Sequence, residues 1–371
     1  MDAALRETTR PRPLWWLRVR PSHPISFFEF WPAWLFYAPV ALQWLGLSLR
    51  YGSPLLLTAA NPRIAAGGLC GESKTSILDQ VEGEARQWLA PYTSLVTDAD
   101  PSRDLAAAEA ALARGGLPYP LVGKPDIGCN GTGVRLIEDR AALARFLADY
   151  PRGVGVILQQ FVPYEGEAGL FYVRLPGESA GRVTSLTLKS APVVVGDGRS
   201  TLEELIRNDP RAGLVPHLYL PRLAGRLAEV PATGVPVRLV FVGNHCKGST
   251  FRNGASEITA ALTEVVDSIA KAIPEFHFGR IDVRYASLAE LRRGKSFRII
   301  EINGAGSEAT HIWDPATRLA DAYAAQFSHY HAAFAIGRAN RARGHRPPAI
   351  REVFRLWRRQ KRLMTSYPMN D

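Results

Sequence analysis

The sequence predicts an α+β fold, because strand patterns and helix patterns both occur and do not follow one simple repeat. Strand-like apolar runs with glycine-rich turns recur from residue 118 onward, and the late ones carry polar side chains in alternation. Helical patterns lie at residues 76–89 and from Thr201, where a hydroxyl can cap the helix. The 371 residues are 46% hydrophobic and 22% charged, so the chain is long enough for two or three domains.

Charge and cysteine usage restrict the class of protein. The formal net charge is +10, and residues 336–371 hold ten Lys and Arg against two acids, while residues 1–20 hold five Arg against two acids. The middle of the chain is then close to neutral, so we expect an anionic surface such as membrane lipid near the ends, and no nucleic-acid partner. The three cysteines are Cys70, Cys129 and Cys246. Their wide spacing argues against disulfides and predicts a cytoplasmic protein, with attachment to the inner face of a membrane as a further expectation.

An apolar, helix-like segment lies near the N-terminus. Residues 33–49 carry no charge, which is about the shortest length that spans a bilayer, and Pro32 and Pro39 would kink or divide a helix. Three alternatives stay open for residues 27–49: an interfacial or re-entrant helix, a true span, or a helix buried against the domain or a partner. Residues 350–364 have the pattern of a basic amphipathic helix, either at a membrane surface or docked on the domain.

A lysine and a glycine-rich turn stand out in "PYPLVGKPDIGCNGTGV". We expect a strand that ends at Lys124, then a tight hairpin, then a second strand. Gly128, Gly131 and Gly133 leave the backbone amides of the turn open to a phosphate group, and the ammonium of Lys124 lies where it can neutralise phosphate charge. The alternative is a plain glycine-rich hairpin without a ligand.

The next strands carry groups that suit a nucleoside. After the strand at residues 156–158, Gln160, Phe161 and Val162 end in backbone groups that can face an adenine edge. Glu167, or otherwise Glu165, can accept hydrogen bonds from ribose hydroxyls. A further strand at residues 183–190 carries a single lysine, Lys189.

Two late strands predict a metal site. "FGRIDVRY" places Arg280 and Asp282 on one strand face, and "SFRIIEINGAG" places Glu301 and Asn303 on one face of the next strand. If these strands pair, Asp282, Glu301 and Asn303 converge as oxygen ligands, which Mg²⁺ prefers. The alternative is a pair of ordinary strands with polar outer faces.

The order of these features resembles the ATP-grasp superfamily. "LVGKPDIGCNGTGV" is similar to the lysine strand and lid loop of D-alanine–D-alanine ligases, and "GRIDV…IIEINGAGS" is similar to their closing R-x-D and E-x-N strands. The resemblance covers residues 72–326. It implies an ATP-grasp fold, in which two α+β subdomains clasp ATP behind an apolar N-terminal segment. The expected division is residues 1–52, 53–118, 119–195 for the lid subdomain, 196–335 for the metal and catalytic subdomain, and 336–371 for a basic tail helix.

The resemblance also implies roles for individual residues. It assigns ATP binding to Lys74, Lys124, Gly128, Gly131, Gly133, Gln160, Phe161, Val162 and Glu167. It assigns one or two Mg²⁺, with Mn²⁺ as the alternative metal, to Asp282, Glu301 and Asn303. Arg280 and Lys189 would stabilise charge on the transferred phosphoryl group and the β- and γ-phosphates. Gly306 and Ser307 would contact a substrate carboxylate.

Lys74 lies in "GGLCGESKT", which nearly spells a phosphate-binding P-loop. Ser73 stands where the P-loop pattern needs glycine, and no strand leads directly into the segment. The stretch "ESKTSIL" instead resembles the lysine segment at the head of a helix in D-alanine–D-alanine ligases. Lys74 and Lys124 would then form a two-lysine clamp, with Gly67 and Gly68 in a hinge or substrate-side loop. A surface lysine near a helix cap is the alternative.

The implied enzyme is an ATP- and Mg²⁺-dependent carboxylate–amine ligase that forms an amide through an acylphosphate, with amino-acid or peptide-like substrates. The alternatives are an ATP-grasp kinase for a small molecule, and a membrane-associated ATP-binding module without turnover. Gln159 and Gln160 depart from the family pattern, in which an acidic residue contacts the adenine amino group. The turn after the E-x-N strand adds residues that could build a different acceptor pocket: Glu308, His311, Trp313 and Asp314. Residues 241–254 could line it through Lys247 or Arg252, whereas His245 and Cys246 are expected to be structural.

Overall fold

The computed structural model describes residues 24–241 and 243–369, and the basic N-terminal residues 1–20 lie outside the described residues. Among the described residues, one sheet has the strand order β1-β4-β2-β3. Its strands are β1 (Tyr92–Val96), β4 (Gly155–Gln160), β2 (Leu121–Pro125) and β3 (Arg135–Ile137). Helices α3 (Pro101–Gly115) and α4 (Arg140–Asp149) bury Leu112, Phe146 and Leu147 against one face of this sheet. The predicted hairpin is present, because β2 and β3 pair antiparallel on either side of the glycine-rich loop.

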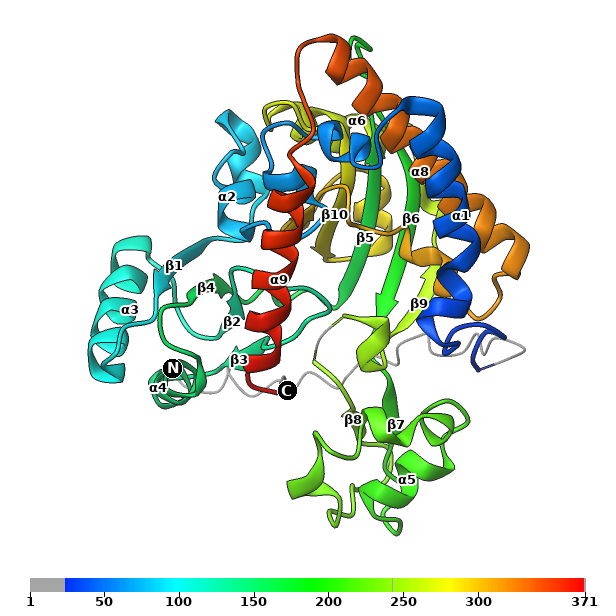
Figure 1. The fold of residues 1–371 in the computed structure, drawn as a ribbon. Helices are drawn as coiled ribbons and strands as arrows, with labels where there is room; N and C mark the ends of the chain where they lie inside the picture. The colour runs from blue at the N-terminus through cyan, green and yellow to red at the C-terminus, as the bar shows by residue number, and fades with distance from the viewer. Residues whose placement is uncertain (1–23, 242, 370–371) are drawn as a thin grey trace.

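The larger sheet has the order β11-β10-β5-β6-β9. Its strands are β11 (Phe297–Asn303), β10 (Phe278–Tyr285), β5 (Gly166–Val173), β6 (Arg182–Ser190) and β9 (Thr250–Asn253). One face packs on α6 (Ala260–Lys271), α7 (Leu288–Arg292) and α2 (Lys74–Leu78), and the other packs on α8 (Leu319–Ala342). Strand β5 is apolar on both sides, with Leu170 in the first core and Phe171 in the second. Helices therefore cover both faces of its centre (Figure 1).

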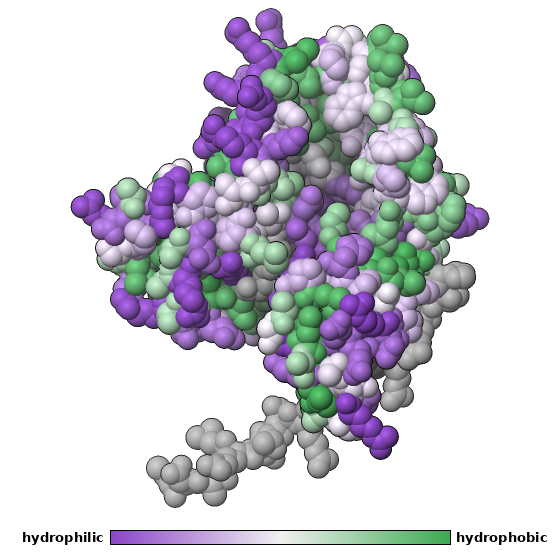
Figure 2. Space-filling model, turned by 60° about the horizontal axis from the view of Figure 1, so that its bottom comes forward, coloured by the Kyte–Doolittle hydropathy of each residue, from purple (hydrophilic) through white to green (hydrophobic). Residues whose placement is uncertain are grey.

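A small subdomain hangs below the larger sheet (Figure 1). It contains β7 (Val193–Val195), α5 (Leu202–Asn208) and β8 (Pro236–Arg238) around its own apolar cluster. Thr201 caps α5, with Glu204 accepting a hydrogen bond from the Thr201 backbone in a capping box. Exposed apolar side chains such as Leu214 and Val235 belong to it, and green patches among purple polar residues are visible on this side of the molecule (Figure 2).

The sheet boundaries do not coincide with the expected divisions at residues 118 and 195. Strand β1 pairs with β4 over Tyr92↔Gln159 to Val96↔Gly155, so part of the 53–118 range belongs to the four-stranded sheet. Strands β5 and β6 fall in the expected 119–195 range but pair within the larger sheet. The division into two sheets depends on pairing between strands that are far apart in sequence. Such pairing cannot be predicted from composition along the chain.

Helix α1 (Ala33–Tyr51) contains most of the apolar N-terminal segment and packs along α8. Gln43 Nε2 donates to the Phe327 carbonyl at 2.8 Å, and the Tyr323 hydroxyl donates to the Phe36 carbonyl at 3.1 Å. Its outer face leaves Trp34 exposed, together with Leu42, Leu45 and Leu49 further along the helix. Within the described ranges, no helix has both the length and the apolar character needed to cross a bilayer.

Helix α9 (Ile350–Ser366) bridges the two sheets on the front of the molecule (Figure 1, red). Near the larger sheet, the Gly71 amide donates to Gln360 Oε1 at 2.6 Å. Near the smaller sheet, the Tyr367 hydroxyl donates to the Ile127 carbonyl at 2.7 Å, beside the glycine-rich loop. The helix is therefore docked along its inner face, while Phe354 and Trp357 stay exposed among its arginines.

Candidate functional site

A cavity of about 670 Å³ lies where the two sheets face each other, and its volume falls in the range of small-molecule sites. Both sheets contribute to its wall, through β2 and β4 on one side and β5, β6, β10 and β11 on the other. Nearly all of the residues predicted for the site line this one cavity: Lys74, Lys124, Gly128, Gly131, Gln160, Phe161, Val162, Glu167, Lys189, Arg280, Asp282, Glu301, Asn303, Gly306 and Ser307.

Gly133 is the exception among the predicted site residues. It has a left-handed φ of 75°, and a Cβ on it would lie 2.5 Å from the Tyr150 hydroxyl oxygen and 3.4 Å from Tyr367 Cβ. Its carbonyl accepts a hydrogen bond from the Tyr150 hydroxyl. The glycine is therefore required by packing at the base of the loop. It was expected to line the cavity, but it is not among the lining residues.

Asp282 lies at the centre of the polar cluster. Its carboxylate accepts from Lys189 Nζ at 2.9 Å, from the Arg280 guanidinium at 3.0–3.2 Å and from Asn303 Nδ2 at 3.1 Å. The side chain is only 2% exposed. Burial alone would raise the pKa of Asp282, but Arg280 and Lys189 outweigh burial and hold the pKa at about 2.

The predicted pairing of the two late strands is confirmed. Strand β10 runs antiparallel to β11, with Asp282 opposite Glu301 and Arg280 opposite Asn303. Directly opposed residues share one face of a sheet, so Asp282, Glu301 and Asn303 turn toward the same cavity. In the described part of the chain, no group of three His, Cys, Asp or Glu is placed to hold a metal.

The donor set nevertheless fits Mg²⁺. Two carboxylates and one amide oxygen are hard ligands, and Mg²⁺ in nucleotide sites takes one or two carboxylates and completes its shell with phosphate oxygens and water. Asn303 turns its amide nitrogen toward Asp282, which leaves its amide oxygen as an acceptor. Asp282, Glu301 and Asn303 are thus the residues of this cavity that could hold the ion.

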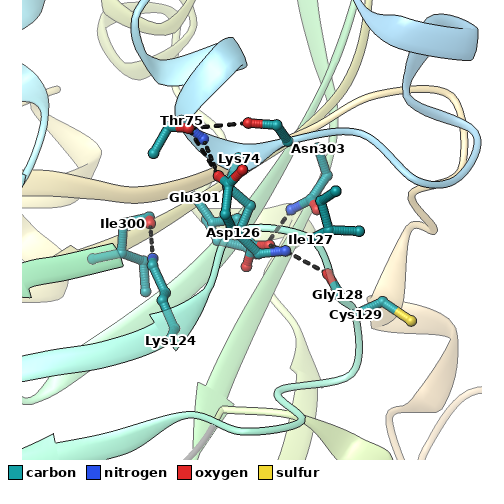
Figure 3. A network of polar contacts seen from close by, with 12 residues as sticks. Lys74, Thr75, Lys124, Asp126, Ile127, Gly128, Cys129, Ile300, Glu301 and Asn303 are labelled. Atoms are coloured by element: carbon teal, nitrogen blue, oxygen red, sulfur yellow. Dashed lines mark hydrogen bonds and ion pairs between the residues drawn. The ribbon is translucent and has the colours of Figure 1, made fainter. Parts of the chain in front are cut away.

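Two lysines reach the cavity from different elements. Lys124 Nζ, at the end of β2, donates to Gln159 Oε1 and to the Ile300 carbonyl, each at 2.8 Å. Lys74 Nζ, at the start of α2, donates to the Gly128 carbonyl and lies 3.4 Å from Glu301 Oε1 (Figure 3). The structure therefore brings the two lysines of the expected clamp to one wall.

The two lysines differ in their electrostatics. Burial lowers the pKa of Lys124 to about 8, and the carboxylate of Glu301 offsets only part of that effect. Burial acts in the same direction on Lys74, but Glu301 and Glu72 outweigh it and raise the pKa of Lys74. Both can be cationic near neutral pH, and Lys124 is the one that titrates close to it.

Local hydrogen bonds explain why Lys74 lies where it does. Ser73 caps α2 by accepting from the Ser76 amide at 3.1 Å. Asp126 Oδ1, which follows β2, accepts from the Thr75 amide and from the Thr75 hydroxyl, both at 2.9 Å (Figure 3). The start of α2 is thereby fixed to the end of the strand that carries Lys124.

The glycines of the near P-loop support the turn that follows β11. The Gly67 carbonyl accepts from the Ala305 amide at 2.9 Å, and the Gly68 carbonyl accepts from the Gly306 amide at 2.7 Å. A Cβ on Gly68 would lie 2.6 Å from Gly304 Cα, so the two backbones touch. These glycines allow two backbone segments to pack together. They support the turn after β11, in place of the expected hinge or substrate-side loop.

The opposite end of the cavity carries the aromatic pair Phe161 and Phe241, whose ring centroids are 6.4 Å apart. The Arg284 guanidinium lies 5.6 Å from the Phe161 centroid. Glu167, expected at a ribose, forms an ion pair with Lys189 at 3.2 Å. Flat rings and a carboxylate are thus available to a nucleoside at this end.

Several lining residues were missed from sequence. Gln159 was expected as a departure from an adenine-site pattern, yet it is buried as the partner of Lys124. Residues 241–254 do line the cavity, but through other side chains than Lys247 and Arg252: Phe241, Asn244, His245, Cys246 and Phe251. Tyr37 of α1 also lines the cavity. It was not predicted to do so, because it lies in an apolar segment. A polar hydroxyl within that apolar run was the available signal.

The turn after β11 contributes Glu308 and Trp313 to the cavity wall, as expected of an acceptor pocket. His311 and Asp314 are not among the lining residues, and Asp314 Oδ2 instead accepts from the Asn253 amide at 2.6 Å. The Ser307 hydroxyl donates to the Gly304 carbonyl at 2.6 Å.

Comparison with known proteins gives structural neighbours only: no family model matches, and no curated protein matches. A bifunctional glutathione synthetase from Pasteurella multocida is 16% identical, with a TM-score of 0.34, over 69% of this chain and 36% of that one. The VanG D-Ala:D-Ser ligase from Enterococcus faecalis is 13% identical, with a TM-score of 0.39, over 72% and 63%. D-alanine–D-alanine ligase from Bacillus anthracis is 15% identical, with a TM-score of 0.39, over 76% and 70%. All three TM-scores lie below 0.5, and this chain spans about a third of the glutathione synthetase.

The low pKa of Lys124 predicts a pH effect on stability. The pKa is 10.5 for an ordinary lysine and about 8 here, so between these values the unfolded chain holds more protons on Lys124 than the folded chain does. The free energy of unfolding should therefore rise with pH across that window, and Lys124→Met should remove this rise. Urea denaturation of both proteins at about pH 7 and about pH 9.5 measures it. The exposed Lys295→Met is the control, and an equal pH response in K124M and wild type would contradict the assignment.

Proposed function

We propose that this chain is an ATP- and Mg²⁺-dependent carboxylate–amine ligase, which joins an acid and an amine through an acylphosphate. The observation that carries the proposal is the composition of one cavity wall. The oxygen ligands Asp282, Glu301 and Asn303 line the same cavity as five cations: Lys74, Lys124, Lys189, Arg280 and Arg284. A triphosphate with a bound divalent ion needs both kinds of group within a few ångströms of each other.

The aromatic end supports a nucleoside in the same cavity. Phe161 and Phe241 can flank a base, the backbone of Gln160 to Val162 can face its edge, and Glu167 can accept from ribose hydroxyls once Lys189 turns to phosphate. Bound Mg²⁺ would add neutralisation of phosphate charge near Asp282 and Glu301. Lys74 and Lys124 would hold the phosphates from the side of the glycine-rich loop.

The proposed reaction has two balanced steps. A carboxylate oxygen of the acid attacks the γ-phosphorus of ATP, the bond to the β-phosphate oxygen breaks, and ADP leaves. The amine nitrogen then attacks the acyl carbon, the bond to the phosphate oxygen breaks, and the amine gives up a proton as the amide forms. Arg280 lies beside Asp282 and can stabilise negative charge on the phosphoryl group and on the tetrahedral intermediate. Covering the site protects the acylphosphate from water, and the glycine-rich loop between β2 and β3 is the element that could do so.

The proposal predicts that Asp282→Asn binds or turns over MgATP poorly. Wild-type protein should bind ATP with Mg²⁺ in calorimetry, and paired acid and amine mixtures should release ADP. Asp282→Asn should lower ADP release by about 100-fold or more, because a neutral amide cannot balance Lys189 and Arg280 or attract the ion. Glu301→Gln should act in the same direction. Exposed Asp321→Asn is the matched control, and thermal unfolding checks that each variant folds.

Three outcomes of that experiment separate the alternatives. ADP release that needs a hydroxyl compound and no amine would favour the kinase. ATP binding without release would favour the binding module. Absence of nucleotide binding with Mg²⁺ present would contradict the proposal as a whole.

We also propose attachment to an anionic membrane surface through residues 27–49 and 350–364. The exposed Trp34, Leu42 and Leu49 on α1 support it, and so does the basic outer face of α9. Wild-type protein should sediment with vesicles that contain anionic lipid, and added salt should weaken this. Replacing Trp34, Leu42 and Leu49 by serine should abolish it, whereas serine at exposed Leu214 should not. Equal sedimentation of both variants would contradict the proposal.

A further inference from the structure

The end of the cavity next to the turn after β11 is organised around one carboxylate, Glu308. Its Oε1 accepts from the Tyr37 hydroxyl at 2.9 Å and from Gln326 Nε2, and its Oε2 accepts from Trp313 Nε1 at 2.7 Å. The donors come from α1, from α8 and from the turn itself. Three neutral groups therefore orient the carboxylate, and together they leave its negative charge uncompensated.

The surroundings of Glu308 are aromatic. Tyr37, Trp313, Tyr330 and His245 all line the cavity with it. His245 stacks on Trp313 with ring centroids 4.6 Å apart, and burial lowers the pKa of His245, so its ring is neutral at physiological pH. Burial, and then the charge of Glu308, raises the pKa of Tyr330 to about 12, which keeps Tyr330 neutral as well. Flat, electron-rich rings beside a carboxylate favour an organic cation.

No cation in residues 24–241 or 243–369 forms an ion pair with the Glu308 carboxylate, although, against the effect of burial, the charge of Glu308 helps that of Asp282 to raise the pKa of Arg280. Glu308 is half-buried, whereas the fully buried acids Asp282 and Glu29 each have an arginine or lysine partner. Arg280 comes nearest, but its NH1 donates to the Glu308 backbone carbonyl at 3.0 Å, while its other nitrogens hold Asp282. The Glu308 carboxylate is therefore open to an ion pair with a cationic ligand, a contact that Arg280 does not make.

We propose that the Glu308 pocket, made of Glu308, Tyr37, Trp313 and Tyr330, binds the ammonium end of an alkyl or arylalkyl amine that carries no carboxylate beside it. This substrate class rests on the proposed ligase function, in which an amine is the acceptor. Arg280 joins the Glu308 backbone to Asp282, so an amine held here lies next to the phosphoryl group.

The absence of a neighbouring carboxylate follows from the groups nearby. The Ser307 hydroxyl proton is already given to the Gly304 carbonyl, so it does not donate to a ligand carboxylate. Lys247 and Arg252 do not line the cavity, and Arg280, which pairs with Asp282, is the residue that the proposed reaction uses for the phosphoryl group. A zwitterionic amino acid would place its own negative charge near Glu308 without a partner, which disfavours the amino-acid acceptor expected from the sequence resemblance.

Equilibrium binding of three probes of one shape tests this pocket without ATP. Phenethylammonium, 2-phenylethanol and 3-phenylpropanoate share a phenyl ring and a short chain and differ in charge. The full chain should bind the ammonium probe about 10-fold or more tighter than the alcohol, and should bind the carboxylate weakest. Glu308→Gln should weaken the ammonium probe by about 10- to 100-fold and leave the alcohol nearly unchanged.

Matched variants keep the test decisive. Glu178→Gln, an exposed acid on another surface, should bind all three probes as the wild type does. Tyr37→Phe removes one donor while keeping the ring, so it should weaken binding of the ammonium probe by a smaller factor than Glu308→Gln does. If Glu308→Gln fails to fold, Tyr37→Phe still tests the pocket. Equal affinities for the three probes, no binding of the ammonium probe at millimolar concentration, or an unchanged affinity in both variants would overturn the pocket. Because no nucleotide is present, these results are independent of whether the chain turns over MgATP.

Discussion

A buried carboxylate, Asp282, is the constraint around which the larger sheet and its cavity are arranged. An isolated carboxylate at this depth would cost several kcal/mol, so it must be matched by cations and hydrogen-bond donors. The matching groups come from three different strands: Arg280 from β10 itself, Lys189 from β6 and Asn303 from β11. Breaking one of these contacts leaves a charge unbalanced inside the protein. A bound metal ion could take the place of Lys189 beside Asp282, because both put a positive charge next to this carboxylate. Lys189 would then be free to pair with a phosphate.

The N-terminal segment is part of both the fold and the cavity wall. Helix α1 packs on α8 and also delivers Tyr37 to Glu308, 271 positions further along the chain. An apolar helix that could have been only a membrane anchor thus forms part of the cavity wall. At the other end of the chain, Gln360 of α9 contacts Gly71, and Tyr367 directly after α9 contacts the loop at Ile127. The helices at both ends of the chain therefore support the cavity, α1 at Glu308 and α9 beside the two sheets.

Sequence periodicity predicted the centre of the site because the relevant residues are spaced two apart on strands. The spacing places Glu301 and Asn303 on one face of their strand, and the β10–β11 pairing then places Asp282 opposite Glu301. The lysine strand and its glycine-rich hairpin were equally readable, because turn chemistry is local. The sequence could not show that Gly133 packs against Tyr150, because a glycine required by packing has the same letter as one that faces a ligand.

What the sequence did not predict depends on contacts between distant segments. The pairing of β1 with β4, the burial of Gln159 against Lys124 and the reach of Tyr37 to Glu308 all involve such contacts. Composition also could not decide whether residues 27–49 face lipid or protein, since both environments select the same side chains. In the structure one side of α1 faces α8, and the other side is exposed.

The most direct test of the proposed site is an experimental structure with Mg²⁺ and a non-hydrolysable ATP analogue. We expect an ion about 2.1 Å from oxygens of Asp282 and Glu301, with the triphosphate between Lys74, Lys124 and Lys189, and with Lys189 moved from Asp282 to phosphate. A nucleotide bound outside this cavity, or one bound inside it with the Lys189–Asp282 ion pair intact and no metal at Asp282, would contradict the proposed site.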